Sequence, residues 1–328
     1  MEEDTSPAVI DSLSAALMKV KLRAFTNVML DAGRKWAVDF PALDGVTLSV
    51  VQKGECWLSI EGHREEVRLR AGDCFLLMGG RKLTLATDLS LKKRFRAEQL
   101  FGKARNGIAT CNGGGEFVVF GTIFRFEGHL IPLMFGRLPP VIHIAADSDN
   151  AAVLRWSLER FGAELRCDSV GRSLVLNHLA PIMLLQALRI YLSSAMDEDN
   201  WLVALRHPRL SKAIEAMQTD FKRDWSVGEL ANLAGMSRSG FALIFKKKVG
   251  VAPMDYLVNW RMQVACDLLR AGDERLSVIA SAVGYGSENA FSVAFTKILK
   301  CRPGAYRKHF GSRSTAPPLA TARTSSSQ

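Results

Sequence analysis

The sequence predicts an α+β protein in which a small antiparallel β-barrel or sandwich precedes helices and an all-α domain with two helix-turn-helix units. Short alternating strands dominate residues 20–145, a helical period begins after Asp147, and the last third of the chain contains an internal repeat. The expected divisions are 1–146 for an antiparallel β-barrel, 147–200 for a helical linker, 201–310 for the all-α domain and 311–328 for a disordered tail.

The β-region is predicted from the alternation of apolar and polar side chains, which places one face of a strand against a core. Turn-like glycines such as Gly54, Gly62 and Gly72 interrupt the alternation. Many short strands at close spacing are typical of a barrel or sandwich. The basic, glycine-rich stretch 88–115 is expected to be a long loop. The predicted strands are 46–50, 57–60, 67–70, 82–85, 117–120 and 123–126.

Helical periodicity replaces alternation after the β-region. Residues 153–161 fit one amphipathic helix and 174–192 fit another, in which Pro181 is expected to produce a kink or a break. The acidic run 197–200 is the expected domain boundary. The tail from Gly311 is poor in apolar residues, which predicts disorder.

Charge is concentrated in the all-α domain. The chain carries a net charge of +10, and residues 201–310 contain 17 Lys and Arg against 9 Asp and Glu. A local basic excess favours a polyanionic partner, although a merely solvated basic surface has the same composition. The six cysteines form no Cys-x-x-Cys pair, and we expect neither a metal site nor disulfides. No secretion signal or membrane span is recognisable, so we expect a cytoplasmic protein.

The internal repeat is the most informative feature of the sequence. Five positions of the first copy recur 49 residues later, and five more recur 50 residues later because the second turn has one extra residue at Gly286. The first set is Val227, Leu230, Ala231, Ala234 and Gly235, which return as Leu276, Ile279, Ala280, Val283 and Gly284. The second set is Ser237, Phe241, Phe245, Pro253 and Tyr256, which return as Ser287, Phe291, Phe295, Pro303 and Tyr306.

Each copy reads as two helices joined by a sharp turn. A glycine permits the left-handed turn, a serine then caps the next helix, and that helix buries phenylalanines at i and i+4. Its opposite face is free to enter a major groove of DNA. A capping box at Ser226 and Glu229 begins the first copy. A long helix over 253–271 is expected to hold the two units at a fixed separation.

These motifs resemble the AraC/XylS family of bacterial transcription regulators. The resemblance is carried by WSVGELANLAGMSRSGFALIFKKKVGVAPMDYLVNWRMQVACDLLR and by VGYGSENAFSVAFTKILKCRPGAYR. In the N-terminal part, WAVDFPALDGVTLSVVQKGECWLSIEG and LRAGDCFLLMGG resemble the cupin-like sensor domain of one branch of the family. The resemblance implies a cupin-like β-barrel for an effector or for dimerisation, joined to a DNA-binding domain of seven helices. It also implies that the helices within 150–196 include a dimer surface.

The recognition helices implied by the resemblance are 237–248 and 287–299, expected about one turn of DNA apart, roughly 34 Å. Leu243 and Val293 stand where the family usually has a basic residue, so contact with thymine methyls replaces an arginine–guanine contact, while Asn289 can still read adenine. The expected base-facing residues are Arg238, Ser239, Ala242, Leu243, Glu288, Asn289, Ser292 and Val293. The expected phosphate contacts are Ser237, Lys246, Lys247, Ser287, Lys297 and Arg307. Lys300 stands where a glycine is expected at a helix end.

Three functions remain open for the N-terminal domain. The barrel can bind an effector, can serve only to dimerise a protein of weak sequence specificity, or can be a metal-dependent cupin enzyme fused to a DNA-binding domain. A two-histidine, one-carboxylate metal site is not recognisable, because His63 is the sole candidate in the first barrel region and lies in a turn. We therefore expect no enzyme activity, no cofactor and no metal. The expected partners are double-stranded DNA, a small-molecule effector, a second copy of the chain and RNA polymerase. Trp36, Trp57 and Phe75 are candidates for a pocket lining or for plain core, and no ligand residue is assigned.

Overall fold

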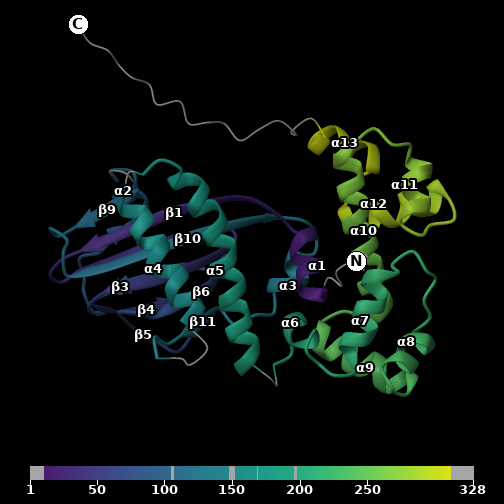
Figure 1. The fold of residues 1–328 in the computed structure, drawn as a ribbon, viewed down its shortest axis with the longest axis horizontal. Coiled ribbons are helices and arrows are strands. Elements are labelled where there is room, and N and C mark those ends of the chain that lie inside the picture. The colour runs from purple at the N-terminus through teal and green to yellow at the C-terminus, as the bar shows by residue number, and fades with distance from the viewer. Residues whose placement is uncertain (1–10, 105–106, 148–151, 168, 196–197, 312–328) are drawn as a thin grey trace, which may run out of the picture.

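Two stacked sheets form the N-terminal domain of the computed structural model, which describes residues 11–104, 107–147, 152–167, 169–195 and 198–311 (Figure 1). The six-stranded sheet has the order β11-β6-β3-β10-β1-β9, and the five-stranded sheet has the order β5-β4-β7-β2-β8. The first comprises β1 (Lys21–Ala32), β3 (Val46–Lys53), β6 (Cys74–Met78), β9 (Ile108–Cys111), β10 (Phe117–Glu127) and β11 (Val141–Ile144). The second comprises β2 (Ala37–Phe40), β4 (Glu55–Ile60), β5 (Val67–Arg70), β7 (Leu83–Ala86) and β8 (Phe95–Arg96).

The predicted α+β class is confirmed, with three differences in the β-domain. In the described residues the sheets end at β11 and β9 and at β5 and β8, so the arrangement is an open sandwich instead of a closed barrel. The sheets are also mixed, because β1 pairs with β9, and β2 with β8, in parallel. The two predicted strands 117–120 and 123–126 form the single strand β10.

The long loop predicted for 88–115 is wrong over much of its length. It contains β8, α2 (Ala97–Phe101) and β9. These elements are too short for periodicity to reveal them, and they form because Phe95, Leu100 and Phe101 pack against the core between the sheets. The glycine run 113–115 does form a turn, with all three glycines at positive φ.

Two long helices cover the outer face of the six-stranded sheet. α4 (Ala152–Arg166) and α5 (Arg172–Ser194) pack against each other, and Phe161 of α4 stacks on Phe120 of β10 with ring centroids 5.7 Å apart (Figure 1). Pro181 does not break α5. Its side chain is exposed, as is Asn177, so the carbonyl that loses its helical hydrogen bond can be solvated.

The C-terminal domain is entirely helical, and α10 runs between its two halves (Figure 1). The first and last residues of α10 match those of the helix predicted over 253–271. The helices are α6 (Trp201–Ala204), α7 (Leu210–Thr219), α8 (Val227–Leu233), α9 (Arg238–Val249), α10 (Pro253–Ala271), α11 (Leu276–Ala282), α12 (Glu288–Leu299) and α13 (Pro303–Gly311). The predicted disordered tail lies outside the described residues.

The two domains share a packed interface along α10. The Gln263 side chain donates to the carbonyl of Lys19, the last residue of α1 (Ser12–Lys19), at 3.0 Å. Gly128 lies so close to Gln263 that an added Cβ would meet its amide oxygen at 2.7 Å. Beside this contact, burial lowers the pKa of the His129 imidazole to about 4, so the ring enters the interface neutral. The short α3 (Ile131–Phe135) follows and contacts α6.

Candidate nucleic-acid interface

The two copies of the repeat have the same turn geometry. Gly235 and Gly284 both adopt left-handed backbone angles, with φ of 61° and 80°. The turn is closed by equivalent hydrogen bonds, from the Met236 amide to the Ala231 carbonyl and from the Tyr285 amide to the Ala280 carbonyl, each 2.9 Å. The left-handed angle is one that a side chain with a Cβ rarely adopts. The predicted helix-turn-helix units are therefore both present.

Equivalent serines begin the second helix of each unit. Ser237 accepts a hydrogen bond from the Gly240 amide, and Ser287 accepts one from the Ala290 amide, both at 3.2 Å. The predicted capping box of Ser226 and Glu229 is complete, with both reciprocal hydrogen bonds. Such caps satisfy amides that a helix leaves unbonded at its start, typically contributing about 1 kcal/mol each.

An aromatic triad fixes each recognition helix to the domain. In the first unit Phe241 and Phe245 have ring centroids 5.4 Å apart, and Phe245 meets Tyr256 edge-on at 5.8 Å. In the second unit Phe291 and Phe295 lie 5.5 Å apart, and Phe295 meets Tyr306 edge-on at 5.5 Å. All four phenylalanines are fully buried. One face of each helix is thus committed to the core, which leaves the opposite face for a partner.

The exposed face of each helix contains the residues predicted to face bases. Leu243 is 72% exposed and Val293 is 62% exposed, so these two apolar side chains are available to a partner. The remaining members are exposed or half-buried on the same helices, and they are Arg238, Ser239, Ala242, Glu288, Asn289 and Ser292. Both surfaces combine small polar groups with an isolated aliphatic group.

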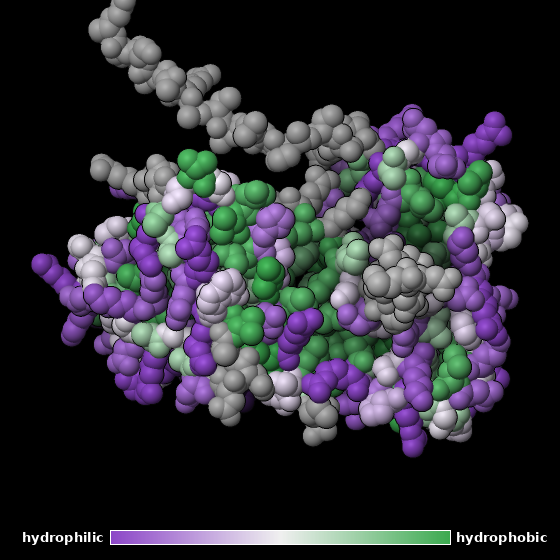
Figure 2. Space-filling view, viewed as in Figure 1, coloured by the Kyte–Doolittle hydropathy of each residue, from purple (hydrophilic) through white to green (hydrophobic). Residues whose placement is uncertain are grey.

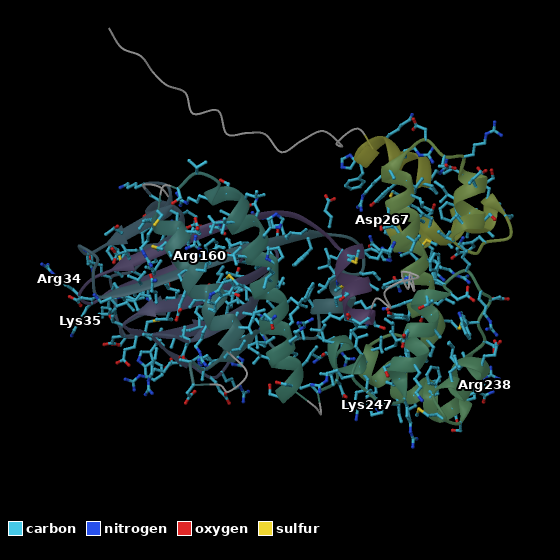
Figure 3. The ribbon with its side chains drawn as sticks, viewed as in Figure 1. Arg34, Lys35, Arg160, Arg238, Lys247 and Asp267 are labelled. Atoms are coloured by element: carbon cyan, nitrogen blue, oxygen red, sulfur yellow. The ribbon has the colours of Figure 1, made fainter. Side chains whose placement is uncertain are left out.

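The residues predicted to contact phosphates differ in their availability. Lys246 and Lys297 are exposed. Lys247, at the opposite end of α9 from Arg238, lies 3.7 Å from the Asp199 carboxylate (Figure 3). Arg307 donates to the Glu274 carbonyl, so its guanidinium already has a partner within the domain. The Ser237 and Ser287 hydroxyls are used as caps. Lys300 occupies the left-handed position expected of a glycine, with φ of 57°.

Comparison with known proteins agrees with this architecture. Residues 11–193 match the family model described as Cupin, and residues 230–309 match the model described as Helix-turn-helix domain. An AraC-like transcription regulator of Streptomyces antibioticus is 38% identical over 301 residues, covering 92% of this chain and 99% of its own length. The chain belongs to the AraC-like transcription regulators. This AraC-like protein is therefore a DNA-binding transcription regulator.

More distant relatives span nearly the same length. The RCS-specific HTH-type transcriptional activator RclR of Escherichia coli is 32% identical over 301 residues, covering 91% of this chain and 98% of its own. Among solved structures, the DNA-binding domain of AdpA in complex with a target DNA is 28% identical, covers 33% of this chain and 97% of its own, and has a TM-score of 0.32. ToxT from Vibrio cholerae O395 is 11% identical, covers 88% and 97%, and has a TM-score of 0.34.

The β-domain of the AraC-like chain contains an apolar cavity of about 230 Å³ between its two sheets. Strands of both sheets and α2 line it, and Thr47, Ser49 and Glu98 are the only polar side chains among the lining residues. Phe75 lines this cavity, whereas Trp36 packs on Phe117 with ring centroids 4.8 Å apart. Phe75 is one of the three aromatic candidates for a pocket lining, whereas the other lining residues look like ordinary strand core in the sequence.

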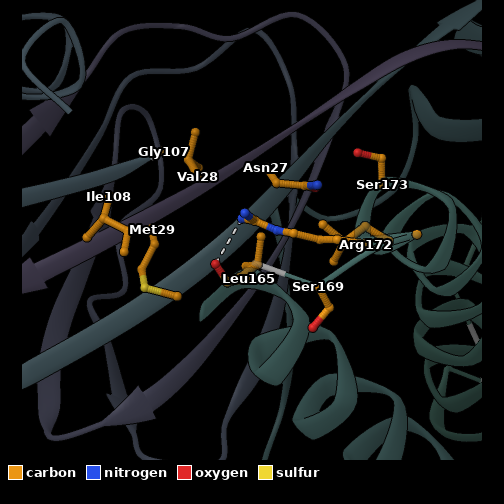
Figure 4. A pocket seen from close by; sticks show the side chains of 11 residues that line it. Asn27, Val28, Met29, Gly107, Ile108, Leu165, Ser169, Arg172 and Ser173 are labelled. Carbon is orange, nitrogen blue, oxygen red and sulfur yellow. Dashed lines mark hydrogen bonds between the residues drawn. The ribbon is translucent and has the colours of Figure 1, made fainter. Parts of the chain in front are cut away.

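A second pocket, of about 400 Å³, lies where the β1–β9 edge of the sheet meets the start of α5. The Arg172 side chain reaches across it and donates to the Leu165 carbonyl at 2.9 Å (Figure 4). Asn27 also lines this pocket, and its side-chain oxygen Oδ1 accepts from the Thr122 hydroxyl at 3.0 Å. Arg172 and Asn27 thus make hydrogen bonds within the protein, which explains their presence in this pocket without a ligand.

No group of three or more His, Cys, Asp or Glu side chains in the described part of the chain is arranged to hold a metal ion. His143 on β11 lies 3.0 Å from the Asp73 carboxylate, a pairing that sequence spacing did not suggest. Asp73 also accepts hydrogen bonds from the amides of Arg70 and Ala146. These contacts join β11 to the turn before β6, so the pairing of His143 with Asp73 has a structural role.

Proposed function

We propose that this regulator lays α9 and α12 into successive major-groove segments on one face of DNA and is controlled by a small apolar effector held between its sheets. The DNA docking is supported by the two equivalent recognition helices. Each is capped, anchored by phenylalanines and exposed on one side. The effector binding is supported by the apolar cavity.

In this docking the base contacts come from short polar and aliphatic side chains. Asn289 is suited to read adenine, and Leu243 and Val293 are suited to contact thymine methyls. No arginine projects from the middle of either exposed face, so specificity depends more on methyl contacts and DNA shape than on guanine recognition. Lys246 and Lys297, exposed near the ends of the two helices, supply phosphate contacts.

Replacing Lys246 and Lys297 together by alanine should flatten the salt dependence of DNA binding. Each phosphate contact contributes about 0.9 to the slope of log affinity against log salt, so the double variant should lose about 1.8. Fluorescence anisotropy with a labelled duplex of about 30 base pairs, spanning nearly three turns, measures this slope. Lys92→Ala, at an exposed lysine of the β-domain, is the control and should leave the slope unchanged. An unchanged slope in the double variant would exclude these contacts.

The chemistry of the cavity limits what the effector can be. A polar ligand would lose hydrogen bonds to water and regain few among side chains that are almost all apolar. An apolar ligand gains by leaving water. We propose that the β-domain binds without catalysing a reaction and that the protein acts in the cytoplasm, where DNA is its target. The relatives named as regulators support this.

A second copy of the chain is the partner we propose for the outer face of α4 and α5. Trp156 is 61% exposed, Val153 55%, Leu174 62% and Ile182 45%. Figure 2 shows hydrophobic surface along these helices. By length and composition α5 could cross a membrane, but its inner side chains pack in the domain core. Glu159 is exposed on α4, and Arg160 is exposed there although it also pairs with Glu164 of the same helix, so a two-fold copy can pair acid with base.

Trp156→Glu should convert the dimer to monomers, because a charge would be buried in an apolar interface. Sedimentation velocity across a range of concentrations measures the change. Val293→Glu makes a similar substitution at an equally exposed residue of α12, away from this face, and should leave the dimer intact. A wild-type chain that sediments as a monomer at every concentration would refute the proposed dimer.

A further inference from the structure

The residues 198–200, which directly precede α6, are held by hydrogen bonds to α5 and α6. The Glu198 carboxylate accepts hydrogen bonds from the Tyr191 hydroxyl of α5 and from Nδ2 of the Asn200 side chain, the latter at 3.1 Å. The side-chain oxygen Oδ1 of Asn200 in turn caps α6 by accepting from the Val203 amide at 3.0 Å. Asn200 is buried. The residue between them, Asp199, is therefore held in a defined position.

The Asp199 carboxylate lies against the last turn of the first recognition helix. One oxygen is 2.9 Å from Nζ of Lys248, and the other is 3.7 Å from Nζ of Lys247. Nζ of Lys248 also donates to the Glu198 carbonyl at 3.3 Å. The hydrogen bond from Lys248 is the main cause that lowers the pKa of Asp199, with the two lysine charges adding to it. The carboxylate is thus ionised and engaged near neutral pH.

A second contact from the N-terminal domain holds the same end of α9. Arg137, which follows α3, donates to the Lys247 carbonyl at 2.8 Å. Lys247 lies four residues after Leu243 and Lys246 three residues after it, so both neighbour the exposed, base-facing side of α9. The side chain of Lys247 is 66% exposed and that of Lys248 only 18%. The end of the recognition helix nearest the β-domain is therefore partly neutralised by the protein itself.

We propose that Asp199 competes with DNA phosphate for Lys247 and Lys248 and so lowers the affinity of the first recognition helix for DNA. This inference rests on the proposed docking of α9. The competition is intramolecular, and its geometry depends on α5 through the bond between Tyr191 and Glu198. A movement of α5, which also covers the β-domain, changes the position of Asp199 and releases or engages the lysines.

The test measures binding of the full chain to an arbitrary labelled duplex, since phosphate contacts do not depend on sequence. Asp199→Asn should bind more tightly at low salt, with a slope steeper by up to about 1.8, or about 0.9 for each lysine released. Between 50 and 200 mM salt, its affinity should then fall by about threefold more per lysine than that of the wild type. Glu215→Gln changes net charge equally on the exposed side of α7 and should behave as wild type. Asp199→Glu keeps the charge and should also retain wild-type binding.

Lysine variants identify the groups that compete. Lys248→Ala should leave the slope of the wild-type chain unchanged and should remove about 0.9 from that of Asp199→Asn. An equal loss in both backgrounds, or Asp199→Asn binding no more tightly than Glu215→Gln, would overturn the proposal. The Lys248→Ala measurement in the wild-type chain does not require Asp199→Asn to fold. Lys246→Ala tests the docking separately: if it flattens the slope and Asp199→Asn does nothing, the docking stands and the competition fails.

Discussion

Phe245→Ala should destabilise the DNA-binding domain by about 3 to 5 kcal/mol and abolish DNA binding at 37 °C. Removing a fully buried phenylalanine loses its transfer free energy and leaves a cavity. The ring also meets Phe241 and the edge of Tyr256, so the variant removes the anchor that joins α9 to α10. A loss of this size is a large fraction of the stability of a typical domain.

The matched control lies two residues away on the same helix. Leu243 is 72% exposed, so Leu243→Ala should change stability by no more than about 0.5 kcal/mol. Urea denaturation followed by circular dichroism gives the free energy of unfolding for both variants. Anisotropy with DNA should then separate them, since Leu243→Ala keeps the fold and alters only the preference for thymine at one position. Equal urea midpoints for the two variants would show that Phe245 does not anchor the helix.

The recognition unit was predictable from sequence because its determinants are local. A turn glycine, a serine cap and phenylalanines four residues apart each act within one or two helical turns, and duplication repeats the signal. Gly235, Ser237 and Phe241 therefore all took the predicted roles. The predicted α10 has the predicted bounds for the same reason.

The features that regulate the helices depend on contacts between distant segments. In the sequence Asp199 is one residue of an acidic linker, and only the fold places it beside Lys248. Arg137 likewise has no sequence feature that indicates its contact with α9. The cavity likewise depends on how the two sheets stack. Its lining strands are apolar in the same way as strands that pack into a core without a cavity, so their sequences do not distinguish the two. The parallel pairing of β9 with β1 joins segments far apart in sequence, which alternation cannot specify.

The cavity between the sheets carries the second large prediction, which concerns the effector. A saturating apolar ligand at a hundred times its dissociation constant should stabilise the chain by about 2.7 kcal/mol. For a β-domain of this size that corresponds to an increase in melting temperature of about 5 to 10 °C. A thermal-shift panel of alkanes, long-chain alcohols and aromatic hydrocarbons should contain such ligands. Sugars and amino acids should give no shift, because Thr47, Ser49 and Glu98 cannot replace their hydration.

Two adjacent residues of β10 provide the matched variants for this experiment. Val119 is buried and lines the cavity, whereas Val118 lies on the opposite face of the strand and packs toward the other core. Val119→Met should fill part of the cavity and remove the ligand-induced shift, and Val118→Met should preserve it. A shift that survives Val119→Met would place the ligand elsewhere. If no compound in the panel stabilises the wild-type chain, the β-domain serves dimerisation alone, and the apolar face of α4 and α5 becomes its functional surface.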